Sequence, residues 1–79
     1  MDKDRYDIFL KAFGKHLRHI RKEKGLSMES VAYEAEIEYR QLGRIERGEV
    51  NTTLVSILRI AEVLKVDLNT LFTFQYRKN

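Results

Sequence analysis

Cysteine and proline are both absent from this chain of 79 residues, and glycine occurs only four times. Without cysteine, neither a disulfide nor a thiolate metal site can stabilise the fold, so the core has to hold by packing. A chain without cysteine is also compatible with the reducing cytoplasm, where we expect this protein to act. Because proline is missing and glycine is scarce, little interrupts helices, and strand-like alternation is nowhere sustained. These absences favour an all-α fold.

Long hydrophobic runs are missing as well. No apolar segment approaches the roughly 20 residues that a membrane-spanning helix requires. The first residues, MDKDRYD, are too acidic and polar for a signal peptide. We therefore expect neither membrane insertion nor secretion. The chain is long enough for one small core and too short for two, so residues 1–79 are predicted to form a single domain.

Positive charge is modest in total but concentrated in one segment. The formal net charge of +3 permits a polyanionic partner without requiring one. Residues 11–24, however, contain six Lys and Arg residues and only one acidic residue, Glu23. This segment is a candidate for contact with nucleic acid, although most lysines on a helix are simply solvated.

The spacing of apolar residues predicts five helices. Ser27, Thr53 and Asp67 are suitable N-caps for the second, fourth and fifth, and Gly25 and Gly48 are suitable terminators of the first and third. Residues 73–79 are expected to trail away as a tail. The predicted helices, with their inner residues, are about 5–24 (Phe9, Phe13, Leu17, Ile20), 28–35 (Val31, Ala32, Ala35), 39–47 (Leu42, Ile45), 54–64 (Leu54, Ile57, Leu58, Ala61, Leu64) and 68–72 (Leu68, Leu71, Phe72).

Residues 27–45 have the period of a helix-turn-helix, with the small Ala32 where two helices cross. Together with FGKHLRHIRKEKGLS, RIERGEVNTTL and ILRIAEVLKVDLNTLF, this segment resembles the lambda-repressor-like, Cro/C1-type (XRE) helix-turn-helix DNA-binding proteins. The resemblance covers about residues 13–72, and the size is similar to that of restriction-modification controller proteins. It implies a compact five-helix domain whose helix at about 39–47 enters the major groove while the helix at 28–35 lies across the backbone.

The third helix carries the residues that match the family's base-reading positions, namely Tyr39, Arg40 and Arg44. The two arginines lie four residues apart and hence on one side of the helix, and one bidentate arginine–guanine pair contributes roughly 1–3 kcal/mol of discrimination. We expect Arg40 and Arg44 to read bases and Tyr39 to make an apolar or phosphate contact. The alternative is a solvated face with i,i+4 charge pairs. Gly43 either lets the helix backbone approach DNA closely or is a tolerated surface glycine.

Phosphate contacts are expected at the beginnings of the second and fourth helices, where free N–H groups attract anions. Arg18, Lys22 and Lys24 are further candidates, for which a purely solvated role is equally open. The residues assigned to phosphate binding are Ser27, Met28, Tyr33, Arg47, Asn51 and Thr52.

The resemblance further implies a partly buried structural pair between Arg21 and Glu46.

Three positions depart from the family pattern. Met28 replaces a common glutamine, which would brace a phosphate contact through its side chain. Glu36 occupies a turn position often held by glycine, and Glu38 stands where serine or threonine usually caps the recognition helix.

Enzyme chemistry finds no support in the sequence. There is no glycine-rich phosphate loop and no nucleophile paired with a base. His16 and His19 have no cysteine or carboxylate converging on them, so we interpret them as surface residues. We therefore expect no catalytic site, no metal and no cofactor.

One such domain covers one half-site, and a symmetric pair would read half-sites roughly 34–36 Å apart. We therefore expect a homodimeric transcriptional regulator bound to a palindromic operator in double-stranded DNA. The dimer interface is expected at Val55, Phe72, Phe74 and Tyr76; alternatively, Phe72 closes the core and the tail is frayed. A different function remains open, in which an antitoxin-like helix-turn-helix engages a partner protein, and Glu36 and Glu38 favour it.

Overall fold

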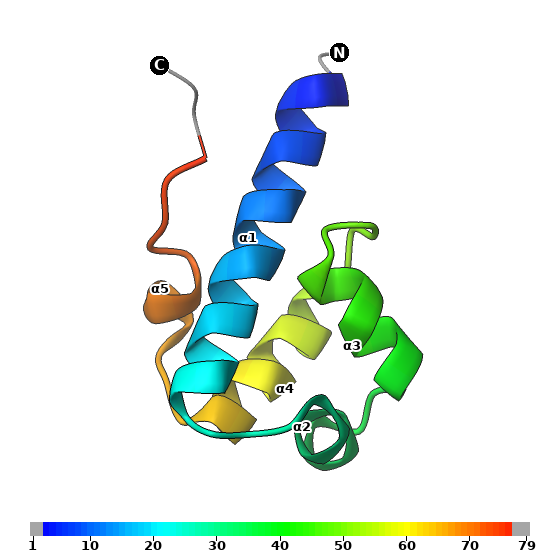
Figure 1. Cartoon of the computed structure of the whole chain (residues 1–79), viewed down its shortest axis with the longest axis vertical. Coiled ribbons are helices and arrows are strands. Elements are labelled where there is room, and N and C mark those ends of the chain that lie inside the picture. Colours follow the sequence, from blue (N-terminus) through cyan, green and yellow to red (C-terminus); the bar gives the residue numbers. More distant parts are fainter. Residues whose placement is uncertain (1–2, 77–79) are drawn as a thin grey trace.

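Five helices pack around one core in the computed structural model, which describes residues 3–76 of the chain and side chains from residue 5 (Figure 1). The long α1 runs the length of the molecule, with α3 on one side and α5 on the other, and α2 packs against α3 and α4 near the lower end (Figure 1). The predicted all-α, five-helix architecture is confirmed. The helices are α1 (Lys3–Glu23), α2 (Met28–Ala35), α3 (Tyr39–Glu46), α4 (Leu54–Leu64) and α5 (Leu68–Leu71).

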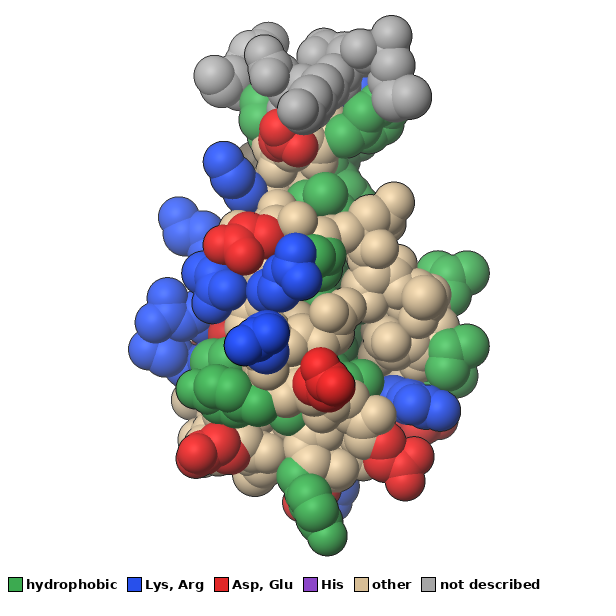
Figure 2. Space-filling model, turned by 90° about the vertical axis from the view of Figure 1, so that its right-hand side faces the viewer, with side chains coloured by type: hydrophobic (Ala, Val, Ile, Leu, Met, Phe, Trp, Pro, Cys, Tyr) green, Lys and Arg blue, Asp and Glu red, His purple; other side chains and the backbone are tan. Residues whose placement is uncertain are grey.

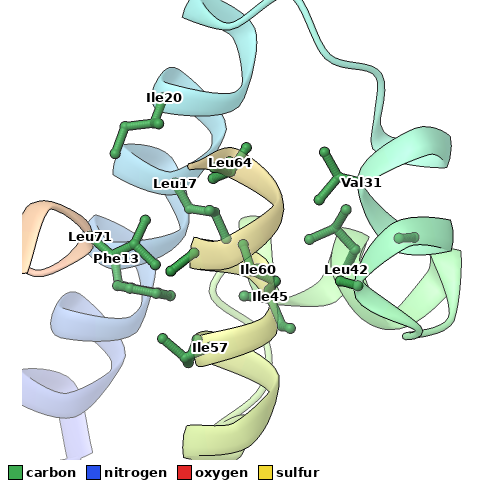
Figure 3. Close-up of a cluster of buried hydrophobic side chains, with 13 residues drawn as sticks. Phe13, Leu17, Ile20, Val31, Leu42, Ile45, Ile57, Ile60, Leu64 and Leu71 are labelled. Atoms are coloured by element: carbon green, nitrogen blue, oxygen red, sulfur yellow. The ribbon is translucent and has the colours of Figure 1, made fainter. Parts of the chain in front are cut away.

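All five helices contribute side chains to the core (Figure 3). Burying these apolar groups is the main favourable contribution to folding in a chain that has no cross-links. No helix within residues 3–76 is both long and apolar enough to cross a membrane. The largest fully buried side chains are Leu17, Val31, Leu42, Ile45, Ile60, Leu64 and Leu71.

Helix α4 differs from the prediction in the face that it buries. Ile57, Ile60 and Leu64 point into the core, whereas Leu54 is 81% exposed and Leu58 is 42% exposed. Both of these leucines were expected to be buried, and that expectation is wrong. The buried set follows spacings of three and four from Ile57, and Leu54 lies in the first turn, on the outer side of that stripe.

The segment after α5 packs against α1 instead of trailing away. The Phe74 ring centroid lies 5.6 Å from that of Phe9 and 5.5 Å from that of His16, and the Tyr76 centroid lies 5.0 Å from Phe9. Figure 1 shows this segment running beside α1. The expected tail is therefore wrong for residues 73–76, because its aromatic rings cover apolar surface on α1. Residues 77–79 lie outside the described part of the chain.

The short helix α5 buries only Leu71 completely. Leu68 and Phe72 were expected to point inward, yet they are 41% and 44% exposed. Phe72 caps the helix and stacks on Phe13, with 5.3 Å between ring centroids. A helix of four residues has room for one inward position, so its neighbours stay at the margin of the core.

Caps fix where α2 and α4 begin. The Ser27 hydroxyl accepts a hydrogen bond from the Ser30 N–H at 3.0 Å, and the Thr53 hydroxyl accepts one from the Ser56 N–H at 3.1 Å. Asp67 occupies the N-cap position of α5, but its side chain makes no capping hydrogen bond.

Two glycines allow α1 and α3 to touch. A Cβ atom on Gly14 would overlap the carbonyl oxygens of Ile45 and Glu46 at the end of α3. Gly48 ends α3 with φ of +72°, and a Cβ atom there would lie 2.5 Å from the Lys11 Cα. The backbones of α1 and of the end of α3 are therefore in direct contact.

Candidate nucleic-acid interface

The turn between α2 and α3 has the left-handed geometry of a helix-turn-helix, although glutamate occupies it. Glu36 has φ of 59° and ψ of 42°. The next residue, Ile37, donates its N–H to the Ala32 carbonyl at 3.0 Å, which closes the end of α2. A non-glycine residue in this conformation costs about 1–2 kcal/mol. The strain expected from the sequence is therefore present, and the turn keeps its shape.

Helix α3 presents two unpaired guanidinium groups to solvent. Arg40 and Arg44 are exposed, and among residues 5–76 neither has an ion-pair or side-chain hydrogen-bond partner. Tyr39, at the start of the helix, is 56% exposed. Glu38 is the N-cap, and its carboxylate makes no capping hydrogen bond. The three residues expected to read bases therefore share the outer surface of α3.

Gly43 does not lie on that outer surface, so the alternative of a tolerated surface glycine is wrong. It is buried, and a Cβ atom there would lie 3.3 Å from the Met28 Cε and 3.1 Å from the Arg47 Nη1. The absence of a Cβ atom leaves room for the ends of the Met28 side chain from α2 and the Arg47 side chain to pack close to α3.

Arg47 and Glu49 form an exposed ion pair at the end of α3. The Arg47 Nε donates to the Glu49 Oε2 at 2.8 Å, and a second guanidinium nitrogen donates to Oε1 at 3.3 Å. The hydrogen bond from Arg47 lowers the pKa of Glu49, and the same bond raises the pKa of Arg47. Arg47, a candidate for phosphate binding, is thus held by a carboxylate that a phosphate would have to replace.

The other phosphate candidates are placed very differently from one another. Tyr33 is 84% exposed and Asn51 is exposed, so both are accessible. Met28 is half-buried and packs against the core. The Ser27 hydroxyl is occupied by its capping bond. The Thr52 hydroxyl is buried without a hydrogen-bond partner among the described residues, so this oxygen points away from any phosphate on the surface.

A buried ion pair holds α3 against α1. Arg21 donates from Nε to the Glu46 Oε2 at 2.7 Å and from Nη2 to Oε1 at 3.0 Å, and its Nη1 donates to the Leu26 carbonyl at 2.9 Å. Both side chains are at most 7% exposed. The structure therefore brings together the two residues expected to form a structural pair, and their bidentate geometry fixes the angle at which α3 is presented.

Apolar side chains on α4 and α5 leave a second exposed surface. Leu54, Val55, Leu58 and Phe72 are all exposed. Beside them, Leu54, Ile57 and Phe72 help to line an apolar hollow of about 180 Å³ between α1 and α4. Val55 and Phe72 were expected in a dimer interface, but Leu54 and Leu58 were not. Their apolar character was visible in the sequence and was assigned to the core.

His16 differs from the expected surface histidine. It is half-buried, and its Nε2 donates to the Thr70 carbonyl at 2.8 Å, which ties α1 to α5. His19 forms an exposed i,i+4 contact with Glu23 at 3.3 Å. Within the described residues there is no group of three His, Cys, Asp or Glu side chains that could hold a metal ion.

Comparison with known proteins identifies the family. The sequence profile of a helix-turn-helix family, HTH_3, matches residues 17–71, which is most of the chain and includes α2, the turn and α3. The chain belongs to this helix-turn-helix family. The Cro/C1-type resemblance is thereby confirmed.

Two relatives of this helix-turn-helix protein are named as control or controller proteins. Control protein C.MunI from Mycoplasma sp is 37% identical over 62 residues, which is 77% of this chain and 84% of the relative. The structure of the restriction-modification controller protein C.AhdI from Aeromonas hydrophila superposes with a TM-score of 0.76 and 39% identity, covering 81% of this chain and 96% of the other. The N-terminal DNA-binding domain of the biofilm regulator SinR from Bacillus subtilis has a TM-score of 0.64 and 28% identity, with 84% and 97% coverage.

Family membership places the protein among DNA-binding regulators of transcription and separates it from enzymes. The matched residues 17–71 include Glu36 and Glu38, which depart from the usual pattern of the family. Since the turn and α3 keep their geometry with these residues, the departures alter local charge and strain without changing the fold.

Proposed function

We propose that the protein is a cytoplasmic transcriptional regulator that binds a palindromic operator in double-stranded DNA as a homodimer, with α3 in the major groove. The observation that carries this proposal is the pair of unpartnered guanidinium groups, Arg40 and Arg44, on the outer surface of a helix seated by a buried ion pair. Arginine forks match the O6 and N7 atoms of guanine, and a rigid seat lowers the entropic cost of aligning them.

The remaining contacts follow from the same placement. Tyr39 and Tyr33 are exposed beside the turn, so Tyr39 is assigned to bases and Tyr33 to a phosphate. Backbone N–H groups would meet phosphates at two places. These are the beginning of α2, at Ser27 and Met28, and the loop before α4, at Asn51. Arg47 would join them after exchanging Glu49 for a phosphate.

Two features support the homodimer. Leu54, Val55 and Leu58 leave apolar surface on α4 that the chain does not cover, and Phe72 lies close to the same hollow. A single domain reaches one half-site, so a symmetric pair would read both halves of a palindrome. Phe74 and Tyr76 are used mainly within the chain, where they pack on Phe9, and would contribute only their outer edges to the interface.

The test of base reading is selection of bound sequences from random duplex DNA. The wild-type protein should enrich a palindrome with guanine in each half-site. Arg44→Ala should lose that guanine preference, weakening specific binding by about 5- to 150-fold, which corresponds to roughly 1–3 kcal/mol. Arg59→Ala, which removes an exposed arginine from α4, is the matched control and should leave the preference intact. No enriched palindrome, or an unchanged preference in Arg44→Ala, contradicts the proposal.

The test of assembly is sedimentation at micromolar concentration. A dimer is expected for the wild type, and Val55→Glu should shift it toward the monomer by placing a charge in the apolar surface. A strictly monomeric wild-type protein would refute the interface.

A second candidate function is docking of a partner protein through the same surface. The exposed carboxylates of Glu36 and Glu38 favour it, because both would repel a nearby phosphate. Salt dependence separates the two functions, since the logarithm of DNA affinity should fall with the logarithm of salt at a slope of about −0.9 for each neutralised phosphate. Binding that is insensitive to salt would favour the protein partner.

A further inference from the structure

Four cations form a row along α1, which includes Arg18 and Lys22, two of the phosphate candidates from the sequence, and extends to Lys11 and Lys15. Lys11, Lys15, Arg18 and Lys22 follow spacings of four, three and four. At 3.6 residues per turn they lie within an arc of roughly 60° and extend over about 17 Å of the helix. All four are exposed. We call these residues the α1 basic row.

The α1 basic row is not neutralised by the protein. Among residues 5–76, none of its members has an ion pair or a side-chain hydrogen bond. The nearby acidic side chains have partners outside the row: Glu23 contacts His19, and Glu49 pairs with Arg47. Asp7 lies one turn before Lys11, at the end of the row. Like charges at i,i+4 repel one another, so the row is a small cost in the free protein that an anionic partner would relieve.

The α1 basic row is continuous with the recognition surface. The turn after α3 packs on α1 at its first member, where a Cβ on Gly48 would lie 2.5 Å from the Lys11 Cα. Further along, Arg18 lines the same shallow hollow as Met28, Gly43 and Arg47, which come from α2 and α3. Figure 2 shows Lys and Arg side chains gathered on one side of this face of the molecule, with few acidic side chains among them.

We propose that the α1 basic row binds the phosphate backbone of the duplex that α3 enters, as a row of contacts separate from those at the ends of α2 and of the loop before α4. The inference rests on the proposed function and deepens it. Its length of about 17 Å corresponds to roughly half of a helical turn of DNA. Lysine suits this purpose, because a flexible point charge tracks a backbone without reading sequence. The row would therefore raise affinity and salt dependence and leave base preference unchanged.

The test compares two double variants with equal changes in charge. Lys11→Gln with Lys15→Gln removes half of the row, and Arg59→Gln with Lys65→Gln removes one exposed cation from the middle of α4 and one from its C-cap. The affinity of each for the selected operator is measured between 50 and 200 mM salt, and circular dichroism verifies that both are folded. The row variant should lose about 1.8 from the magnitude of the salt slope, so its defect relative to the wild type should shrink about tenfold across this range. The control should keep the wild-type slope.

Phosphate ethylation interference then locates the contacts. Ethylation of certain phosphates should weaken the wild-type protein and have no effect on the row variant, while the selected base sequence stays the same for both. Equal salt slopes for the two double variants, or identical interference patterns for wild type and row variant, would overturn the inference and leave base reading by α3 intact. A wild-type protein without specific, salt-dependent binding would overturn both.

Discussion

Replacing Arg21 by methionine tests whether the buried ion pair seats the recognition helix. Methionine retains much of the apolar stem but removes all three hydrogen bonds, two to Glu46 and one to the Leu26 carbonyl. The Glu46 carboxylate would then be buried without a partner, since its side chain is only 4% exposed. Removing one member of a buried pair costs about 3–5 kcal/mol. Domains of this size have a total stability of roughly 4–12 kcal/mol, so the loss is a large part of the whole.

Thermal unfolding followed by circular dichroism is the assay. A domain of about 60–100 residues loses about 4–8 °C of Tm per kcal/mol, so Arg21→Met should lower Tm by more than about 12 °C. The double variant Arg21→Met with Glu46→Leu removes both charges and should recover most of that loss. Arg47→Met breaks the exposed pair with Glu49 and is the matched control, with little expected change in Tm. The reasoning is refuted if Arg21→Met melts like the wild type, or if the double variant is no more stable than the single one.

Three further predictions concern the contact between α1 and α3, the turn between α2 and α3, and the ion pair after the end of α3. Gly14→Ala should destabilise the protein by about 1–3 kcal/mol in denaturant unfolding, since its methyl group forces α1 away from α3, and an unchanged midpoint would exclude that close approach. Glu36→Gly should raise Tm by relieving the left-handed backbone; a fall would mean that the lost side chain matters more. Glu49→Gln should strengthen DNA binding severalfold by releasing Arg47 and removing a negative charge, and titration of labelled duplex showing equal or weaker binding would argue against phosphate contact by Arg47.

Much of the fold could be predicted from local signals. The helices and the caps at Ser27 and Thr53 follow from apolar spacing and from hydroxyls placed before it, which are properties of short segments. The errors concern what one segment does to another. Leu54 and Leu58 fit the apolar period of α4, but only the position of neighbouring helices decides which side of that period is covered. Phe74 looked like part of a tail because its partner Phe9 is distant in sequence.

In the candidate interface, too, some features could be predicted from local sequence and others depend on packing between segments. The outward placement of Arg40 and Arg44 follows from the two buried positions, Leu42 and Ile45, that fix the orientation of α3. The burial of Gly43 could not be predicted, because it depends on how closely Met28 approaches from α2. The Arg47–Glu49 pair depends on side-chain conformations after the end of a helix, which periodicity does not specify.

The packing of the Met28 and Arg47 side chains beside Gly43 bears on how the proposed DNA specificity could be changed. A Cβ atom at position 43 would lie 3.1 Å from the Arg47 Nη1 and 3.3 Å from the Met28 Cε, so a larger residue there would have to displace both side chains. Libraries aimed at new specificity should therefore vary Tyr39, Arg40 and Arg44 and keep the glycine, because those side chains can change without moving the backbone that carries them.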